Sequence, residues 1–300
     1  MTDQPDLFLA ATPPLALREQ LAARFRLHEG EPPATTRAVL GSGTTLLDTA
    51  MLERLPALEI VAINGVGYEG LDLAALRARG VRVTTTPDVL TDDVADLAIG
   101  LMLAVERRIA TNDRLVRAGG WAAPLARRAS GRRVGIFGMG AIGRAIAARA
   151  APFAAEIVYS ARSAKPDLPY RFLPDIGALA EASDVLILIA PGGAGTREVV
   201  NAAVLDRLGP GGVLINVARG SLVDQRALVE ALEAGRIAGA GLDVFADEPH
   251  VPEALRGMDH VVLSPHQGSA THEGRAAMAA LVLANLDAHF AGRPLPTPLI

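Results

Sequence analysis

The sequence contains no cysteine, only one tryptophan and no apolar run long enough to cross a membrane. Without cysteine, disulfides, thiolate catalysis and cysteine-ligated zinc or iron–sulfur centres are excluded. The longest apolar runs, such as residues 97–105, are far shorter than the roughly 20 residues that span a bilayer. Half of the residues are hydrophobic and 21% are charged, a balance typical of globular, core-forming chains.

Strong charge of either sign is also missing. The 29 basic and 33 acidic residues leave a net charge of −4, which favours neither nucleic acid nor an acidic membrane surface as a partner. The first residues, from Met1 to Asp6, are acidic and lack the basic region that precedes the apolar part of a signal peptide. We therefore expect a cytoplasmic protein that binds neither nucleic acid nor a membrane, and we predict no metal site.

Short apolar segments alternate with helical patterns along most of the 300 residues. This alternation is typical of α/β proteins with parallel sheets, and two doubly wound domains fit the length. In the first third we predict strands at 7–10, 38–41, 58–64 and 81–84, with helices at 15–23, 45–52 and 71–79. We then predict a single helix over 91–109, and an arm or linker over 111–132.

A second series of strands begins after residue 132. Here we predict strands at 134–137, 157–160, 185–190, 212–216, 239–243 and 260–264, with helices at 141–150, 201–207 and 225–234. A last helix is predicted from residue 272 to residue 290. Six strands with right-handed crossovers would form a doubly wound, Rossmann-type sheet.

A glycine motif, Gly138-x-Gly140-x-x-Gly143, lies between the first strand of this series and its helix. Such a motif is weak evidence alone, but a preceding strand and a following helix are the context that a dinucleotide site requires. Gly138 would permit the tight turn, Gly140 the approach of the pyrophosphate, and Gly143 the close packing of helix on strand. The phosphates would then meet the helix N-terminus at Ala141 and Ile142.

The segment after the second strand of the series indicates which dinucleotide binds. An NAD site usually carries an acidic residue there, which binds the ribose 2′-hydroxyl. Residues 160–165 contain no acid, and instead provide the hydroxyls of Ser160 and Ser163 together with the guanidinium of Arg162. These groups suit a 2′-phosphate, so we predict NADP in preference to NAD.

Three polar residues follow successive strands on one edge of the predicted sheet. Arg219 follows the strand at 212–216, Glu248 the strand at 239–243, and His266 the strand at 260–264. Ligands of open α/β sheets bind beyond the carboxyl ends of the strands. Reduction of a 2-oxo acid needs a proton donor, a carboxylate that orients it, and a cation for the substrate carboxylate and carbonyl. We assign these roles to His266, Glu248 and Arg219.

Each of these assignments has a competitor in the sequence. Asp247 adjoins Glu248 and is a rival partner for the histidine. His250 and His272 lie near enough in sequence to compete with His266. Arg219 on its own would also suit a strand cap or a phosphate ligand.

At this point the motifs resemble those of the D-isomer-specific 2-hydroxyacid dehydrogenases. The resemblance covers most of the chain, and four blocks carry it in order: 138–143, 216–224, 239–249 and 264–271. Within the family, the Tyr-Ser-Ala-Arg-Ser segment and the end of the last helix look most like NADP-using glyoxylate/hydroxypyruvate reductases. The resemblance implies the catalytic roles assigned above.

The resemblance also implies further site residues and a domain arrangement. Backbone N–H groups of Val66 and Gly67 would hold the substrate carboxylate, and Asp243 would contact the nicotinamide carboxamide. We add Val217, Ala218 and Gly268 to the predicted cofactor contacts. The substrate domain would be flavodoxin-like and comprise residues 1–96 and 274–300, with the dinucleotide-binding domain at 97–273. Such enzymes usually form homodimers, with the helix from Thr91 and the arm near Trp121 in the interface.

The sequence leaves three functions to compare. The first is reduction of glyoxylate or hydroxypyruvate to the D-2-hydroxy acid, and the second is reduction of a bulkier hydroxyphenylpyruvate. The third is a cofactor-sensing regulatory protein on the same fold. The presence of Arg219, Glu248 and His266 together favours catalysis.

Overall fold

The computed structural model describes residues 4–300, so the first three residues of the acidic N-terminus lie outside it. The chain divides into two compact units, residues 1–90 with 271–300 and residues 91–270. The predicted boundaries, at 96/97 and 273/274, lie inside two helices, whereas the observed ones immediately precede the first of these helices and the N-cap of the second. A continuous helix is one rigid body, so each of these helices belongs wholly to one unit.

The first unit contains a five-stranded parallel sheet in the order β2-β1-β3-β4-β5. Its strands are β1 (Asp6–Leu9), β2 (Arg26–His28), β3 (Thr36–Gly41), β4 (Ile60–Ile63) and β5 (Arg82–Thr84). Its helices are α1 (Leu15–Ala22), α2 (Thr49–Glu53), α3 (Leu73–Ala78) and α11 (His272–Phe290).

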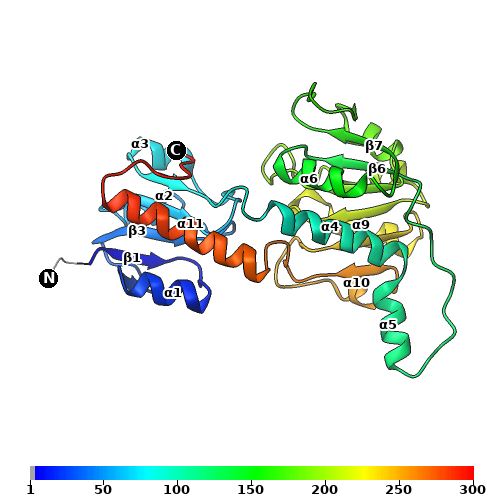
Figure 1. The fold of residues 1–300 in the computed structure, drawn as a ribbon, viewed down its shortest axis with the longest axis horizontal. Coiled ribbons are helices and arrows are strands. Elements are labelled where there is room, and N and C mark those ends of the chain that lie inside the picture. Colours follow the sequence, from blue (N-terminus) through cyan, green and yellow to red (C-terminus); the bar gives the residue numbers. More distant parts are fainter. Residues whose placement is uncertain (1–3) are drawn as a thin grey trace. The chain divides into compact units, whose positions relative to one another are not determined.

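Both faces of this sheet are buried, as expected for parallel strands. Along β1, Leu7 and Leu9 belong to a core with side chains of α1 and α11, whereas Phe8 belongs to a second core with side chains of α2 and α3. This alternation along one strand places helices on opposite faces of the sheet, and Figure 1 shows the resulting layers around β1 and β3.

The second unit contains a seven-stranded parallel sheet in the order β12-β11-β10-β9-β6-β7-β8. The strands are β6 (Arg132–Phe137), β7 (Ala154–Ser160), β8 (Arg171–Phe172), β9 (Val185–Leu188), β10 (Val213–Asn216), β11 (Gly239–Leu242) and β12 (Val261–Leu263). The order reverses beside β6, and this reversal is the point where doubly wound sheets bind dinucleotides. The predicted α/β class with two doubly wound sheets is confirmed.

Helices cover this second sheet as well. They are α4 (Thr91–Glu106), α5 (Ile109–Arg117), α6 (Ala141–Ala150), α7 (Ile176–Glu181), α8 (Ala202–Leu208), α9 (Gln225–Glu233) and α10 (Glu253–Gly257). Side chains of α7, α8 and α9 form one core with β9 and β10. Helix α4 packs on β10, β11 and α6.

The prediction of one helix over 91–109 is wrong at its end. Arg108 adopts a left-handed conformation with a φ of 54°, which an α-helix cannot continue through. The chain starts again as α5, inside the predicted arm, and residues 118–131 then return to β6 without regular structure (Figure 1). The sequence also missed β2, β8, α7 and α10, and α2 begins four residues later than predicted because Asp48 caps it.

Across residues 4–300, the structure contains no helix with the length and apolar character needed to cross a membrane.

Candidate active site

The glycine turn after β6 has the geometry of a phosphate cradle. A Cβ at Gly138 would lie 2.6 Å from the backbone nitrogen of Ala190, and one at Gly143 would lie 2.1 Å from the carbonyl oxygen of Gly138. A side chain is therefore excluded at both positions by backbone. Gly140 is exposed, and a Cβ there would meet nothing within 4 Å. The open face of the turn is thus at Gly140, where the sequence placed the pyrophosphate.

Helix α6 begins directly after this turn. Its N-cap is Gly140, which has no side chain to bond the first N–H groups, and Ala141 is exposed at the first position. Uncapped N–H groups and the positive end of the helix dipole attract anions. The turn and the helix together fit the pyrophosphate of a dinucleotide.

The segment after β7 carries the residues predicted to choose the dinucleotide. Ser160 ends the strand with only 2% of its surface exposed, while Arg162 and Ser163 are exposed. The loop is anchored because the Lys165 amide donates to the buried Tyr159 hydroxyl at 2.6 Å. Arg162 forms no hydrogen bond or ion pair with any residue in 4–300, so its guanidinium is available for a ligand.

Arg219 follows β10 in a turn that Asn216 organises. The Asn216 side chain is 1% exposed, accepts from the Ala218 amide at 3.1 Å and donates to the Arg219 carbonyl at 3.0 Å. The Val217 amide donates to the Leu188 carbonyl at 3.3 Å. Val217 and Ala218 are therefore buried, with their N–H groups already bonded within the turn. Sequence reasoning missed the role of Asn216, although a polar residue closing an apolar strand was a visible signal.

Asp243 organises the loop that carries His266. Its carboxylate is 1% exposed and accepts three hydrogen bonds, from the Ser264 hydroxyl at 2.6 Å and from the amides of Gln267 and Gly268 at 2.7 and 2.8 Å. The His266 amide donates to the Asp243 carbonyl at 2.8 Å. Gly268, a predicted cofactor contact, therefore has its N–H bonded to Asp243.

His266 and Glu248 form a direct pair. The Nδ1 of His266 lies 2.7 Å from Oε2 of Glu248, and Oε1 of Glu248 accepts from the Phe245 amide at 3.0 Å. The backbone of His266 is left-handed, with a φ of 55°, which is uncommon for a residue other than glycine. This leaves Nε2 of a half-exposed imidazole as its free nitrogen.

The charge of Glu248 follows from two opposed effects. Burial raises the pKa of this carboxyl, but the hydrogen bonds from His266 and Phe245 and the nearby charges of His266 and Arg219 outweigh burial. The net effect lowers the pKa of Glu248, so the carboxylate stays ionised at neutral pH. The influence of Arg219 on Glu248 places the two side chains in one electrostatic site.

The competitors do not take part in the hydrogen bond between His266 and Glu248. Asp247 pairs with His250 at 3.5 Å, and both side chains are about four-fifths exposed. His272 is exposed at the start of α11, in the first unit. Within residues 4–300 no three His, Asp or Glu side chains are grouped as a metal site.

In the first unit, the predicted carboxylate-binding loop follows β4. The Gly65 carbonyl accepts from the Thr86 amide at 2.8 Å, which fixes the start of the loop. The N–H groups of Val66 and Gly67 donate to no group in the described part of the chain. Successive free N–H groups in a fixed turn form a concavity that suits an anion.

Comparison with known proteins places this geometry in a family. Residues 99–268 match the family described as "D-isomer specific 2-hydroxyacid dehydrogenase, NAD binding domain". The chain is 50% identical over 267 residues to glyoxylate/hydroxypyruvate reductase A of Arabidopsis thaliana, covering 88% of this chain and 85% of that one. It is 51% identical, with the same coverage, to hydroxyphenylpyruvate reductase of Plectranthus scutellarioides.

A solved structure agrees over nearly the whole length. It is an NADPH-dependent glyoxylate/hydroxypyruvate reductase from Sinorhizobium meliloti in complex with NADP and malonate, 43% identical, with a TM-score of 0.93 over 99% of this chain and 97% of that one. The resemblance seen in the sequence motifs is confirmed. The chain belongs to the D-isomer-specific 2-hydroxyacid dehydrogenase family of nicotinamide-dependent enzymes.

Proposed function

We propose that this protein reduces glyoxylate or hydroxypyruvate to the 2-hydroxy acid, with D configuration where C2 becomes chiral, and that it prefers NADPH. The observation that carries the proposal is the 2.7 Å contact between His266 Nδ1 and Glu248 Oε2, with Arg219 acting on the same carboxylate. The similarity to glyoxylate/hydroxypyruvate reductases at about half identity supports this substrate class.

The proposed mechanism divides the reaction among three side chains. Glu248 fixes the imidazole through Nδ1, so the proton that neutralises the developing oxyanion leaves from Nε2 of His266. The Arg219 guanidinium binds the substrate carboxylate and polarises the carbonyl. The nicotinamide, when bound, supplies the hydride that adds to C2. One hydride and one proton convert the carbonyl to the hydroxyl, and His266 is reprotonated from solvent.

The first unit also offers donors for a carboxylate in this proposal. The N–H groups of Val66 and Gly67, which donate to no group in residues 4–300, would donate to the substrate carboxylate. The division into a substrate domain and a dinucleotide-binding domain is thus a functional proposal about the two units.

The residues proposed for the cofactor surround the glycine turn. Gly138, Gly140 and Gly143, with the helix start at Ala141 and Ile142, hold the pyrophosphate. The remaining proposed contacts are Ser160, Arg162, Ser163, Val217, Ala218, Asp243 and Gly268. Because the N–H groups of Val217, Ala218 and Gly268 are bonded within the protein, these residues would shape the nicotinamide site by packing.

The preference for NADP rests mainly on Arg162. This exposed arginine has no partner among the described residues and no acid between residues 160 and 165 competes for it. A charged hydrogen bond contributes about 1.5–3 kcal/mol, so Arg162→Ala should raise the KM for NADPH roughly tenfold to a hundredfold. The KM for NADH should change less than threefold, because NADH carries no 2′-phosphate. An equal change for both nicotinamides would contradict the assignment.

We also propose a homodimer formed through α5 and the arm. Large apolar side chains are exposed there, with Ile109 and Val116 about half exposed, Trp121 at 87% and Leu125 at 99%. An apolar patch of this kind marks an association surface. The end of the arm is anchored, since Arg127 lies 3.3 Å from the buried Glu106 carboxylate. Light scattering tests this proposal, and Trp121→Ser with Leu125→Ser should shift the mass to that of the monomer.

The experiment that tests the function is steady-state reduction of glyoxylate, hydroxypyruvate and 4-hydroxyphenylpyruvate with NADPH and with NADH. We expect the two small acids and NADPH to give the highest kcat/KM. A clear preference for the aromatic acid would select the second function that the sequence leaves open. NADPH binding without turnover of any of the three acids would favour a sensor. A cytoplasmic location stays a prediction, which cell fractionation tests.

A further inference from the structure

A cavity of about 430 Å³ opens at the carboxyl ends of β1, β3 and β4, within the first unit. Its volume lies in the range of about 300–1,000 Å³ that small-molecule sites occupy. Leu40 and Gly41, the last two residues of β3, line the cavity. Residues that follow β1 and β4 line it as well. This is the edge of an open α/β sheet at which ligands bind.

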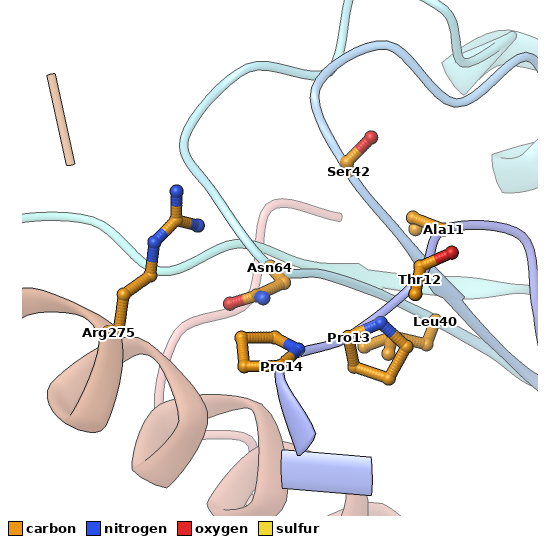
Figure 2. Close-up of a pocket in the computed structure, with 9 residues that line it drawn as sticks. Ala11, Thr12, Pro13, Pro14, Leu40, Ser42, Asn64 and Arg275 are labelled. Atoms are coloured by element: carbon orange, nitrogen blue, oxygen red, sulfur yellow. The ribbon is translucent and has the colours of Figure 1, made fainter. Parts of the chain in front are cut away.

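The polar lining of the cavity consists of donors without an acid. Thr12, Ser42, Asn64 and Arg275 supply two hydroxyls, an amide and a guanidinium, and no aspartate or glutamate of residues 4–300 lines the cavity. Figure 2 shows the Asn64 amide between the Arg275 guanidinium and the Thr12 side chain in this view. The charge of the site is therefore positive.

Arg275 has no counter-ion. It lies near the start of α11 and is partly buried, and its side chain forms no hydrogen bond or ion pair with any residue in 4–300. The contrast with other arginines of this unit is clear, since Arg37 pairs bidentately with Glu59, and Arg79 donates to two carbonyls. A partly buried guanidinium without a partner is a ready donor for a carboxylate, which matches its fork geometry.

Asn64 is the second incompletely bonded group at the cavity. Its Oδ1 is buried and has no hydrogen-bond partner, although its backbone amide donates to the Gly41 carbonyl at 2.9 Å. Buried polar atoms are almost always bonded, so an exception marks a place where a ligand or a water completes the network. The backbone bond fixes the position of Asn64, while its side chain still lacks a partner.

The cavity reaches the start of the proposed carboxylate-binding loop, because Asn64 lines the cavity and immediately precedes Gly65. An acid held by the N–H groups of Val66 and Gly67 therefore has the cavity beside it. A three-carbon acid leaves most of the space unfilled. A longer chain that ends in an anion would bring its far end to Arg275.

We propose that Arg275, assisted by Asn64, is a specificity residue that binds a second carboxylate, at the end of a 2-oxo acid remote from the reacting carbonyl. The inference rests on the proposed function and deepens it, because it adds 2-oxo dicarboxylic acids to the substrates. The acid's first carboxylate stays at the Val66–Gly67 loop, and its second carboxylate is the counter-ion of Arg275.

The test compares two acids of equal chain length, 2-oxoglutarate and 2-oxopentanoate, which differ only in the terminal carboxylate. The measurement is kcat/KM for each acid, with whichever nicotinamide supports faster glyoxylate reduction. For the wild-type enzyme we expect 2-oxoglutarate to exceed 2-oxopentanoate. Arg275→Met should lower kcat/KM for 2-oxoglutarate about tenfold to a hundredfold and change glyoxylate and 2-oxopentanoate less than threefold.

Two further variants separate this role from a structural one. Arg275→Lys keeps the charge without the fork, so it should recover part of the preference. Arg77→Met removes an exposed arginine of α3 in the same unit. It should leave the ratio of kcat/KM for 2-oxoglutarate to kcat/KM for 2-oxopentanoate unchanged. A wild-type ratio at or below one, or an equal loss for all acids in Arg275→Met, would overturn the proposal.

A 2-oxo acid whose far end carries hydroxyls and no charge gives the remaining outcome. If 2-keto-D-gluconate exceeds 2-oxoglutarate and loses as much in Arg275→Met, the cavity binds hydroxyls and the second-carboxylate proposal is overturned. If the enzyme reduces glyoxylate and hydroxypyruvate, and Arg275→Met does not change kcat/KM for 2-oxoglutarate, only this inference is contradicted. Failure to reduce any 2-oxo acid would contradict the proposed function, and the inference with it.

Discussion

The two units end their parallel strands in opposite ways. In the second unit the groups around the proposed catalytic histidine are bonded to one another, with three donors on Asp243 and two on Glu248. In the first unit, the Arg275 side chain, Asn64 Oδ1 and the N–H groups of Val66 and Gly67 have no partner among residues 4–300.

We interpret this difference as one between groups that carry out the reaction and groups that recognise the substrate. Groups that move a proton or stabilise an oxyanion act best when they are held in place before the reaction, since they then need no rearrangement. Groups that recognise a variable part of a substrate must instead be left open for it. We therefore expect changes in the second unit to lower turnover of every substrate, and changes in the first unit to alter which substrate is turned over.

The largest effect should come from His266→Ala. Removing the proton donor should lower kcat roughly 10²- to 10⁴-fold for all 2-oxo acids, because general acid catalysis contributes about that factor. His272→Ala, at an exposed histidine of α11, is the matched control and should stay within twofold of wild type. Near-normal turnover in His266→Ala would show that another group donates the proton.

Glu248→Gln should have the next largest effect and a distinct pH dependence. Loss of the ionised partner should lower kcat/KM about tenfold to a hundredfold, as expected for a charged hydrogen bond. The folded-state pKa of Glu248 lies below its usual 4.5, so the pair stabilises the fold above that pH and the benefit disappears as pH falls through the lowered value.

The variant should accordingly melt below wild type at pH 7, and the gap in Tm should narrow at pH values under about 4.5. Thermal unfolding followed from pH 3 to pH 8 measures this gap. A gap that is constant with pH would mean that the carboxylate charge at Glu248 does not stabilise the fold.

A smaller loss is expected for Asp243→Asn. The substitution keeps the shape but removes the charge that three donors share, and it turns an NH₂ group toward one of them. The loop that holds His266 should loosen, so kcat should fall about tenfold with little change in KM. Asp247→Asn, at an exposed neighbour, is the control. A change in KM for the nicotinamide alone would indicate direct contact with the cofactor instead.

The sequence predicted the catalytic edge of the second unit but missed short elements in both units, for a physical reason. Arg219, Glu248 and His266 follow the apolar segments at 212–216, 239–243 and 260–264, and parallel strands bring their carboxyl ends to one edge. The strand and helix at Val134–Ala150 are strongly patterned and were placed almost to the residue. By contrast, β8 (Arg171–Phe172) and β2 (Arg26–His28) are short and contain charged or polar residues, so they show no apolar run.

Other features depend on contacts that the sequence does not display. Glu248 and Asp247 are chemically equivalent neighbours, and only the path of the loop turns one of them toward His266. Asn216 and Asp243 act through backbone groups brought to them by other strands. Arg275 stands out only when its lack of a partner is seen, and that absence is a property of the fold.

The smallest expected effect comes from removing one helix N-cap in each unit, which tests whether the two units unfold independently. Asp72 caps α3 in the first unit by accepting from the Ala75 amide at 2.9 Å, and Asp224 caps α9 in the second by accepting from the Ala227 amide at 3.0 Å. Replacing either aspartate by alanine should cost about 1 kcal/mol. If each unit opens as its own cooperative body, Asp72→Ala should speed hydrogen exchange only in peptides from 4–90 and 271–300, and Asp224→Ala only in peptides from 91–270. Exchange that rises across both units in either variant would show that the two sheets unfold together, and the contrast between them would then be one of chemistry and not of stability.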